Sequence, residues 1–262
     1  MKGKVKAMNY IGIDIGSTAA KTVVYDGNKI VYSFTMPSGW NSKETAKLIQ
    51  DMLLQRGYDV RDPNSITFST GYGRVSVPYA LQSVTEITCH GRGSYYLLGR
   101  DCTVIDVGGQ DTKVISLENG QVSRFLMNDK CSAGTGKFIE ILANRLNVEI
   151  NEMFALAEKG VPIVISSMCT VFAESEVIGY MGNGESRENI AAGVINSIVN
   201  KVGQLCGSHV ITGPCILTGG LSLSDYFIRM LSERLHQNVI GHEMGKYAGA
   251  LGAALIAKQK SN

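Results

Sequence analysis

An internal repeat constrains the fold of this chain more than any other feature of its sequence. The segments 14–21, DIGSTAAK, and 106–113, DVGGQDTK, place an aspartate, a glycine and a lysine at the same spacing. Each segment lies at the end of an apolar run and leads into a second β-type run and a turn, DGN in the first case and ENG in the second. Two halves that begin in the same way predict a duplicated α/β domain with a cleft between the two copies.

Residue periodicity and turn residues predict the secondary structure along the chain. We expect strands over 10–15, 22–25, 30–35, 66–70 and 215–218, and helices over 42–55, 136–146, 149–158, 170–181, 187–207 and 222–235. The apolar, small-residue segment GALGAALIA predicts a last helix that packs closely on another element. The first half is therefore α/β, and the chain after residue 128 is mainly helical.

Composition excludes several classes of protein. The 262 residues carry a net charge of only +2, which leaves no electrostatic footprint for nucleic acid or for an acidic membrane surface. No apolar run approaches the length of a membrane span. The first residues lead directly into a strand with an aspartate inside it, unlike a secretory signal, so the six cysteines indicate a reducing compartment. We expect a cytoplasmic protein with small-molecule and protein partners.

Three glycine turns follow three predicted strands, and together they predict a phosphate site. The turns are Gly16-Ser17-Thr18, Gly108-Gly109-Gln110 and Gly219-Gly220. Glycine lets backbone N–H groups approach a phosphate, and Ser17, Thr18 and Lys21 add hydroxyl donors and a positive charge. Asp14 and Asp106 each precede a turn by two residues, and paired carboxylates at strand ends suit a hydrated Mg²⁺. One such turn alone is better explained as an ordinary tight turn, so the repetition carries the prediction.

Two other nucleotide-binding motifs do not fit. The segment 131–138, CSAGTGKF, is similar to a Walker A loop, but that motif needs glycine at position 131 and serine or threonine at position 138. No G-x-G-x-x-G sequence follows the first strand, because Gly12 and Gly16 are too far apart. A Rossmann dinucleotide site is therefore not expected.

Cys131 and Cys169 share a setting that the other four cysteines lack. Each follows an apolar run and precedes a capping residue and a predicted helix, whose N–H groups and dipole stabilise an anionic metal–sulfur centre. A 4Fe-4S cluster takes four thiolates, and the chain has no C-x-x-C run, so two ligands per chain suggest two chains. On this chemistry alone, a cluster ligand and a buried thiol explain Cys131 and Cys169 equally well. The other four lie in apolar contexts typical of buried cysteine: Cys89, Cys102, Cys206 and Cys215.

Taken together, these motifs resemble the activators of 2-hydroxyacyl-CoA dehydratases, in the ATPase family that they share with the ATP-binding subunits of benzoyl-CoA reductases. The resemblance rests on GIDIGSTAAK, TGYGR, DVGGQDTKVI, NDKCSAGTGKF, SSMCTVFAESEVI, LTGG and GALGAAL, which cover nearly the whole chain in order. The two cysteine segments are the most specific, because sugar kinases of the same superfold need neither cysteine. The resemblance implies the actin/Hsp70/sugar-kinase fold, with a first half over 1–98 completed by the helix 246–259 and a second half over 99–245.

The resemblance also implies a function. It implies a homodimer that holds one 4Fe-4S cluster through Cys131 and Cys169 of each chain, with ATP or ADP in each cleft. Ferredoxin or flavodoxin would reduce the cluster, and a docked dehydratase-type enzyme would receive one electron. Helices starting at Ser132 and Thr170 would run from the cluster toward the cleft, so that cleft closure would change the exposure of the cluster.

The same resemblance assigns roles to single residues. The nucleotide and Mg²⁺ would be held by Asp14, Gly16, Ser17, Thr18, Lys21, Asp106, Gly108, Gly109, Gly134, Gly219 and Gly220. Asp106 would also be catalytic, and Gln110 or Asp111 would position the attacking water. Family members often carry proline and glutamine near the last helix, where this chain has Glu243 and Lys246. The adenosine contacts of that segment therefore depart from the family pattern.

Two other functions remain open on the sequence. A sugar or small-molecule kinase of the same fold would leave the cysteines merely buried. An actin-like or cell-division-type scaffold would use ATP to polymerise, but no long polar insertion interrupts the core segments.

Overall fold

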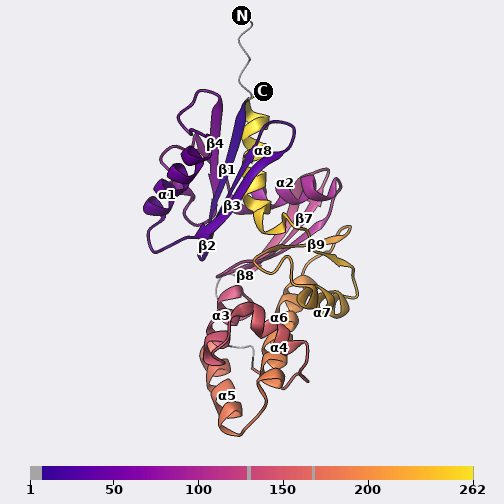
Figure 1. Ribbon diagram of the computed structural model, residues 1–262. Helices are drawn as coiled ribbons and strands as arrows, with labels where there is room; N and C mark the ends of the chain where they lie inside the picture. Colours follow the sequence, from indigo (N-terminus) through magenta and orange to yellow (C-terminus); the bar gives the residue numbers. More distant parts are fainter. Residues whose placement is uncertain (1–7, 129–130, 167–168, 262) are drawn as a thin grey trace, which may run out of the picture. The chain divides into compact units, whose positions relative to one another are not determined.

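The computed structural model describes residues 8–128, 131–166 and 169–261. The chain divides into two compact units, and each contains a sheet with helices beside it (Figure 1). The first unit runs to Asp101 and also includes Leu117–Ser123 and the chain from Lys246 onward; the second comprises Cys102–Ser116 and Arg124–Gly245. Within the described ranges, every helix is too short or too polar to cross a membrane.

The two sheets have the same topology. The first contains β1 (Asn9–Ile15), β2 (Ala19–Tyr25), β3 (Ile30–Pro37), β4 (Ser65–Thr70) and β5 (Gln82–Ser83), in the order β3-β2-β1-β4-β5. The second contains β6 (Thr103–Val107), β7 (Thr112–Glu118), β8 (Gln121–Asn128), β9 (Cys215–Gly219) and β10 (Val239–Ile240), in the order β8-β7-β6-β9-β10. Both central strands, β1 and β6, pair antiparallel with the next strand in the chain and parallel with a later one. The duplication predicted from the repeat is confirmed.

Strand register brings the repeated residues to equal positions in the two halves. An aspartate of the central strand lies between a lysine and a threonine of its neighbours: Asp14 between Lys21 and Thr70, and Asp106 between Lys113 and Thr218. A glycine follows each threonine, and both Gly71 and Gly219 have φ of +85°. A Cβ atom on either glycine would collide with the backbone of the central strand. The two halves therefore share an aspartate, a lysine and a threonine–glycine pair at the end of the central strand. We call these residues the shared frame.

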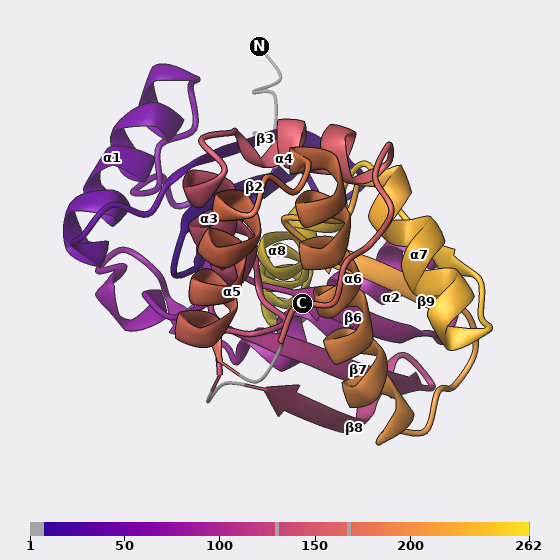
Figure 2. The same cartoon turned by 90° about the horizontal axis from the view of Figure 1, so that it is seen from below.

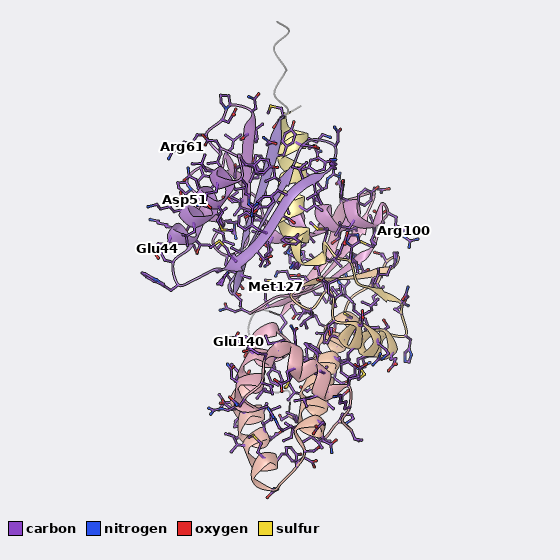
Figure 3. All side chains as sticks on the ribbon, viewed as in Figure 1. Glu44, Asp51, Arg61, Arg100, Met127 and Glu140 are labelled. Atoms are coloured by element: carbon purple, nitrogen blue, oxygen red, sulfur yellow. The ribbon has the colours of Figure 1, made fainter. Side chains whose placement is uncertain are left out.

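Helix α1 (Ser42–Gln55) has the predicted bounds for two local reasons. The Asn41 side chain caps it by accepting a hydrogen bond from the Lys43 N–H at 2.9 Å. Its buried residues recur every three or four positions and include Ile49 and Leu53, which face the core of the first unit. Charged side chains such as Glu44 and Asp51 lie on the exposed face (Figure 3).

The predicted last helix, α8 (Ala248–Ser261), is confirmed, and it packs on β1 and on α2 (Glu86–Leu98) (Figure 1). Glycines make this close approach possible. A Cβ at Gly93 of α2 would meet the carbonyl oxygen of Ala248, and one at Gly252 of α8 would meet that of Cys89. The sequence prediction missed α2, because glycines inside a helix lower its intrinsic propensity while tertiary packing here requires them.

The second unit contains five helices within its described residues: α3 (Gly136–Arg145), α4 (Ile150–Ala157), α5 (Thr170–Gly182), α6 (Arg187–Gly207) and α7 (Asp225–Leu235). The predicted bounds of α6 are confirmed, and it packs against α4 and α7 within one apolar core. One expected helix start was wrong: α7 begins at Asp225 and not at residue 222, because Ser222 and Ser224 form turns. Helix α3 begins at Gly136, as the periodicity predicted, and not at Ser132, because Thr135 N–H closes a turn on the Ser132 carbonyl at 3.0 Å.

The packing of α8 generates a prediction about stability. We expect Gly252→Ala to lower the free energy of unfolding by about 1–3 kcal/mol or more, because the new methyl group meets the backbone of α2, which cannot yield like a side chain. Gly207→Ala at the end of α6 is the matched control: open space surrounds that position, and alanine favours the helix by about 1 kcal/mol. Urea denaturation measures both, and equal midpoints would contradict the packing argument.

Candidate functional site

The first glycine turn connects β1 and β2. Gly16 N–H donates to the Ala19 carbonyl at 3.1 Å, and the Ser38 hydroxyl donates to the Gly16 carbonyl at 2.6 Å. Gly16 and Ser17 are half-buried and Thr18 is exposed, so the tip of the turn can contact a ligand.

The carboxylate beside this turn has one oxygen without a partner. Asp14 is buried, and its Oδ2 lies 3.5 Å from the Lys21 ammonium. Its Oδ1 is also buried and accepts no hydrogen bond from any described residue. A buried carboxylate oxygen in that condition is costly unless a cation or a donor approaches it. Asp14 is therefore a fitting metal ligand, either directly or through water.

The second glycine turn connects β6 and β7 and has the same closing bond, from Gly108 N–H to the Asp111 carbonyl at 2.9 Å. Behind it lies a buried charge cluster. Lys113 Nζ lies 2.5 Å from Asp111 Oδ1 and 3.4 Å from Asp106 Oδ2, and the Thr218 hydroxyl donates to Asp106 Oδ1 at 2.8 Å. Both oxygens of Asp106 are therefore engaged within the protein, so its contribution to a metal site would act through water or through the turn.

One of the differences between the two halves changes a charge beside the turn. Ala19 of the first turn stands where the second has Asp111. The side chain of Lys21 is 19% exposed, whereas that of Lys113 is 2% exposed. Lys21 is therefore the lysine that reaches solvent and can meet an anion, while Lys113 is neutralised by carboxylates.

The two residues expected to position the attacking water differ in exposure. Gln110 is exposed at the tip of its turn, whereas Asp111 is buried and hydrogen-bonded to Lys113. The sequence left a choice between Gln110 and Asp111. Gln110 is the better placed of the two to orient a water molecule, because its side chain is exposed and that of Asp111 is held by Lys113.

The segment around Gly134 is bonded directly to the second glycine turn. The first N–H groups of α3 donate to the turn, Gly136 to the Gly108 carbonyl at 2.8 Å and Lys137 to the Gly109 carbonyl at 2.9 Å. The buried Thr112 hydroxyl donates to the Gly134 carbonyl at 2.7 Å. Gly134 has φ of +90°, a conformation that other residues rarely adopt. The third glycine turn lies at the end of the neighbouring strand. Gly219 of β9 pairs with Val107, the last residue of β6, and the exposed Gly220 follows it.

The structure brings the two candidate ligand cysteines onto neighbouring segments. Cys169 lies at the start of α5, as predicted, but it is itself the N-cap, whereas the residue after it was expected to cap the helix. Cys131 lies five residues before α3, so the expectation of a helix directly after it was wrong. The hydroxyls of the following residues, Ser132 and Thr170, are hydrogen-bonded at 2.6 Å. Both cysteines are half-buried. Two partly accessible thiols next to a shared hydrogen bond fit the edge of an iron–sulfur cluster.

The remaining four cysteines are buried, as expected. Burial raises the pKa of Cys89 and Cys206 to about 12 and that of Cys215 to about 11. These thiols are therefore inert near neutral pH.

Sequence analysis missed several residues of the site. Thr70 and Thr218 occupy equivalent places beside the two aspartates, and Thr112 and the Ser132–Thr170 pair join segments that are distant in sequence. A signal for the first two was present, because TG follows an apolar run in both halves. Nothing in the sequence indicates the other contacts, since they depend on tertiary structure.

The buried charge cluster generates a prediction. We expect Lys113→Met to lower the free energy of unfolding by about 3–5 kcal/mol, because it leaves two buried carboxylates, Asp106 and Asp111, without their cation. Lys21→Met is the matched control in the other half and should cost less, since the Lys21 side chain is 19% exposed and its loss leaves less buried charge uncompensated. Urea denaturation of both variants measures the difference, and a larger loss for Lys21→Met would reverse the assignment.

The burial of the thiols generates a second prediction. In the folded, iron-free protein near pH 7.5, iodoacetamide should modify Cys131 and Cys169 and leave the four buried cysteines intact until denaturant is added. The reason is that those four are inaccessible, and burial also raises the pKa of three of them. Peptide mass spectrometry identifies the modified sites. Modification of Cys206 or Cys215 at a comparable rate would contradict the structure.

Comparison with known proteins places the chain in a family. Residues 11–257 match the model of the BadF/BadG/BcrA/BcrD ATPase family. The (R)-2-hydroxyglutaryl-CoA dehydratase activating ATPase of Acidaminococcus fermentans is 38% identical over 96% of this chain and 97% of its own length. A solved structure of the activator of the 2-hydroxyisocaproyl-CoA dehydratase from Clostridium difficile, with bound ADPNP, superposes with a TM-score of 0.90, at 35% identity over 97% of this chain and 96% of that one.

More distant structures support the fold alone. A ROK family glucokinase from Streptomyces griseus, in complex with glucose and AMPPNP, has a TM-score of 0.61 at 15% identity and covers 96% of this chain and 99% of its own. The fold is thus the actin-like and sugar-kinase fold that the sequence predicted. By the match over nearly its whole length, the chain belongs to the BadF/BadG/BcrA/BcrD ATPase family.

Proposed function

We propose that this protein is an ATP-hydrolysing iron–sulfur activator that transfers one electron to a 2-hydroxyacyl-CoA dehydratase-type partner enzyme. The observation that carries the proposal is the juxtaposition of Cys131 and Cys169, whose neighbouring hydroxyls are hydrogen-bonded at 2.6 Å. A kinase of the same fold would have no use for two half-buried thiols on adjoining segments. The relatives at 35–38% identity are dehydratase activators by name, and one of them was solved with ADPNP.

The glycine turns supply the nucleotide site in this proposal. We take the two halves as residues 1–98 with 246–259 and residues 99–245, and each half carries a glycine turn suited to the phosphates of ATP or ADP. Backbone N–H groups and the Ser17 and Thr18 hydroxyls donate to phosphate oxygens, and Lys21 adds a positive charge that reaches solvent. Mg²⁺ would neutralise phosphate charge when bound, and Asp14, with its unpartnered buried oxygen, is the residue best suited to hold it.

Catalytic roles follow from what each side chain is free to do. Exposed Gln110 orients the attacking water, since the Asp111 carboxylate is already engaged by Lys113. Asp106 accepts hydrogen bonds from Lys113 and Thr218 and so acts on the turn indirectly, since Lys113 also holds Asp111, whose carbonyl closes the turn with Gly108 N–H. A fixed turn presents its donors where negative charge develops on the transferred phosphoryl group, which is the main way such sites accelerate phosphoryl transfer.

The cluster would be shared between two copies of the chain. A 4Fe-4S cluster takes four thiolates and stores one transferable electron, whereas each chain offers only Cys131 and Cys169 as partly accessible thiols. The residues that follow Cys169 support a subunit contact there, because Val171 and Phe172 are each 65% exposed and Ile178 of the same helix is 51% exposed. Ferredoxin or flavodoxin would supply the electron.

The test separates the two sites by a pair of variants. Asp106→Asn should lower Mg²⁺-dependent ATP turnover by about a hundredfold or more, because it loosens the second turn, and should leave the iron content unchanged. Cys169→Ser should remove the iron and leave nucleotide binding intact. Asp225→Asn, exposed at the start of α7, should change neither.

Iron analysis and ATP turnover, measured on anaerobically prepared protein, check both variants. The unmodified protein should contain about four iron atoms per dimer. Iron that survives Cys169→Ser, or a monomer that holds four iron atoms, would refute the shared cluster.

A further inference from the structure

We infer that Thr112, Ser132 and Thr170 are positioning residues that connect the second glycine turn to both cysteines through hydroxyl hydrogen bonds. The inference rests on the proposed function, in that it takes Cys131 and Cys169 as the ligands of the cluster. It adds the physical route by which the state of the nucleotide reaches each of them. All residues of the route lie in the second unit.

The first step joins the glycine turn to α3. Helix N-termini usually receive a side-chain cap, but Thr135 forms no such bond. The Gly108 and Gly109 carbonyls instead accept from the first two N–H groups of the helix, at 2.8 and 2.9 Å. A displacement of the turn therefore moves the start of α3 with it.

The second step joins the turn to the segment that carries Cys131. Thr112 directly follows the turn, and its buried hydroxyl holds the Gly134 carbonyl at 2.7 Å. The Thr135 hydroxyl in turn donates to the Ser132 carbonyl at 2.7 Å. The Asn128 carboxamide donates to the Cys131 carbonyl at 3.2 Å, so the cysteine is held from the β8 side as well.

A cavity beside this segment gives it room to move. Its volume is about 310 Å³, and its lining includes Thr112, Met127 (Figure 3), Asn128, Gly134, Lys201 and Leu205. The segment is thus bonded to the turn and also borders a space that no described side chain fills. Because packed interiors resist small displacements, such a space favours the transmission of a displacement along the bonded route.

The third step reaches Cys169. Ser132 and Thr170 each follow a candidate ligand directly, and their hydroxyls are bonded at 2.6 Å. Helices α3 and α5 lie side by side (Figure 2), and Arg145 and Glu174 form an ion pair between them. The hydroxyl pair acts at the cysteine end of α5, whereas the ion pair joins residues further along both helices. The two contacts can therefore be tested separately.

The experiment measures thiol reactivity in the iron-free protein. The alkylation rates of Cys131 and Cys169 are determined by peptide mass spectrometry without nucleotide, with Mg²⁺–ADP and with a non-hydrolysable ATP analogue. In the unmodified chain we expect the nucleotide to change both rates. Thr170→Val, which removes the hydroxyl and keeps the shape, should reduce the nucleotide effect on Cys169 by about fivefold or more and leave that on Cys131 in place. Ser132→Ala should do the same.

Thr112→Val should weaken the response of both cysteines to the nucleotide. The reason is that Thr112 joins the glycine turn to the segment of Cys131, and on this route Cys169 is reached only through Ser132 of that segment. Thr170→Ser should restore the response of Cys169. Ser175→Ala is the matched control, since that exposed hydroxyl bonds only to the Val171 carbonyl within α5 among the described residues. Arg145→Gln tests the ion pair as an alternative route.

Two outcomes would overturn the inference: an unchanged Cys169 response in Thr170→Val, or no nucleotide response of either thiol in the unmodified chain. Failure of the proposed function looks different. A protein whose thiols respond as described but which binds no iron anaerobically would keep the hydroxyl route and refute the cluster.

Discussion

The ion pair between Lys113 and the two carboxylates Asp106 and Asp111 is the interaction on which the second unit depends. A buried ammonium is tolerated only when carboxylates surround it, so both flanks of the second glycine turn are fixed by one charge. The turn carbonyls that result then replace a side-chain cap at the start of α3. The charge cluster, the glycine turn and α3 therefore form one hydrogen-bonded body rather than three separate features.

The two halves show how one frame can serve two purposes. Both place an aspartate, a lysine and a threonine–glycine step at the end of a central strand. The second half adds Asp111, which neutralises its lysine and makes the turn rigid. The first half has Ala19 there, so Lys21 is not enclosed by a second carboxylate of the turn and stays partly exposed. The Asp14 oxygen also lacks the threonine hydroxyl bond that Asp106 receives from Thr218. The duplicated fold thus has a turn backed by a buried charge cluster in one half and a turn beside a more accessible lysine in the other.

Sequence predicted most of the fold because its strongest signals are local. The DIGSTAAK and DVGGQDTK repeat predicted the duplicated topology, and capping residues with apolar periodicity predicted α1 and α6 to the residue. The errors arose where tertiary contacts override local preference. Helix α2 contains Gly91 and Gly93, which local propensity disfavours but packing requires, and no helix directly follows Cys131 because Gly134 has positive φ in a turn. The site was predicted by residue type, yet the bonds of Thr112 and Ser132 are visible only in three dimensions.

These bonds also give the two cysteines different surroundings. The N–H groups at the start of α3 are used by the Gly108 and Gly109 carbonyls, so Cys131 does not receive the helix N-terminus that its sequence suggested. Cys169 is the N-cap of α5, and no side chain caps the first N–H groups of that helix. The position of Cys169 is therefore set by α5 itself, whereas that of Cys131 depends on its segment and hence on the glycine turn. In a cluster held by both, Cys131 would be the ligand that responds to the turn most directly.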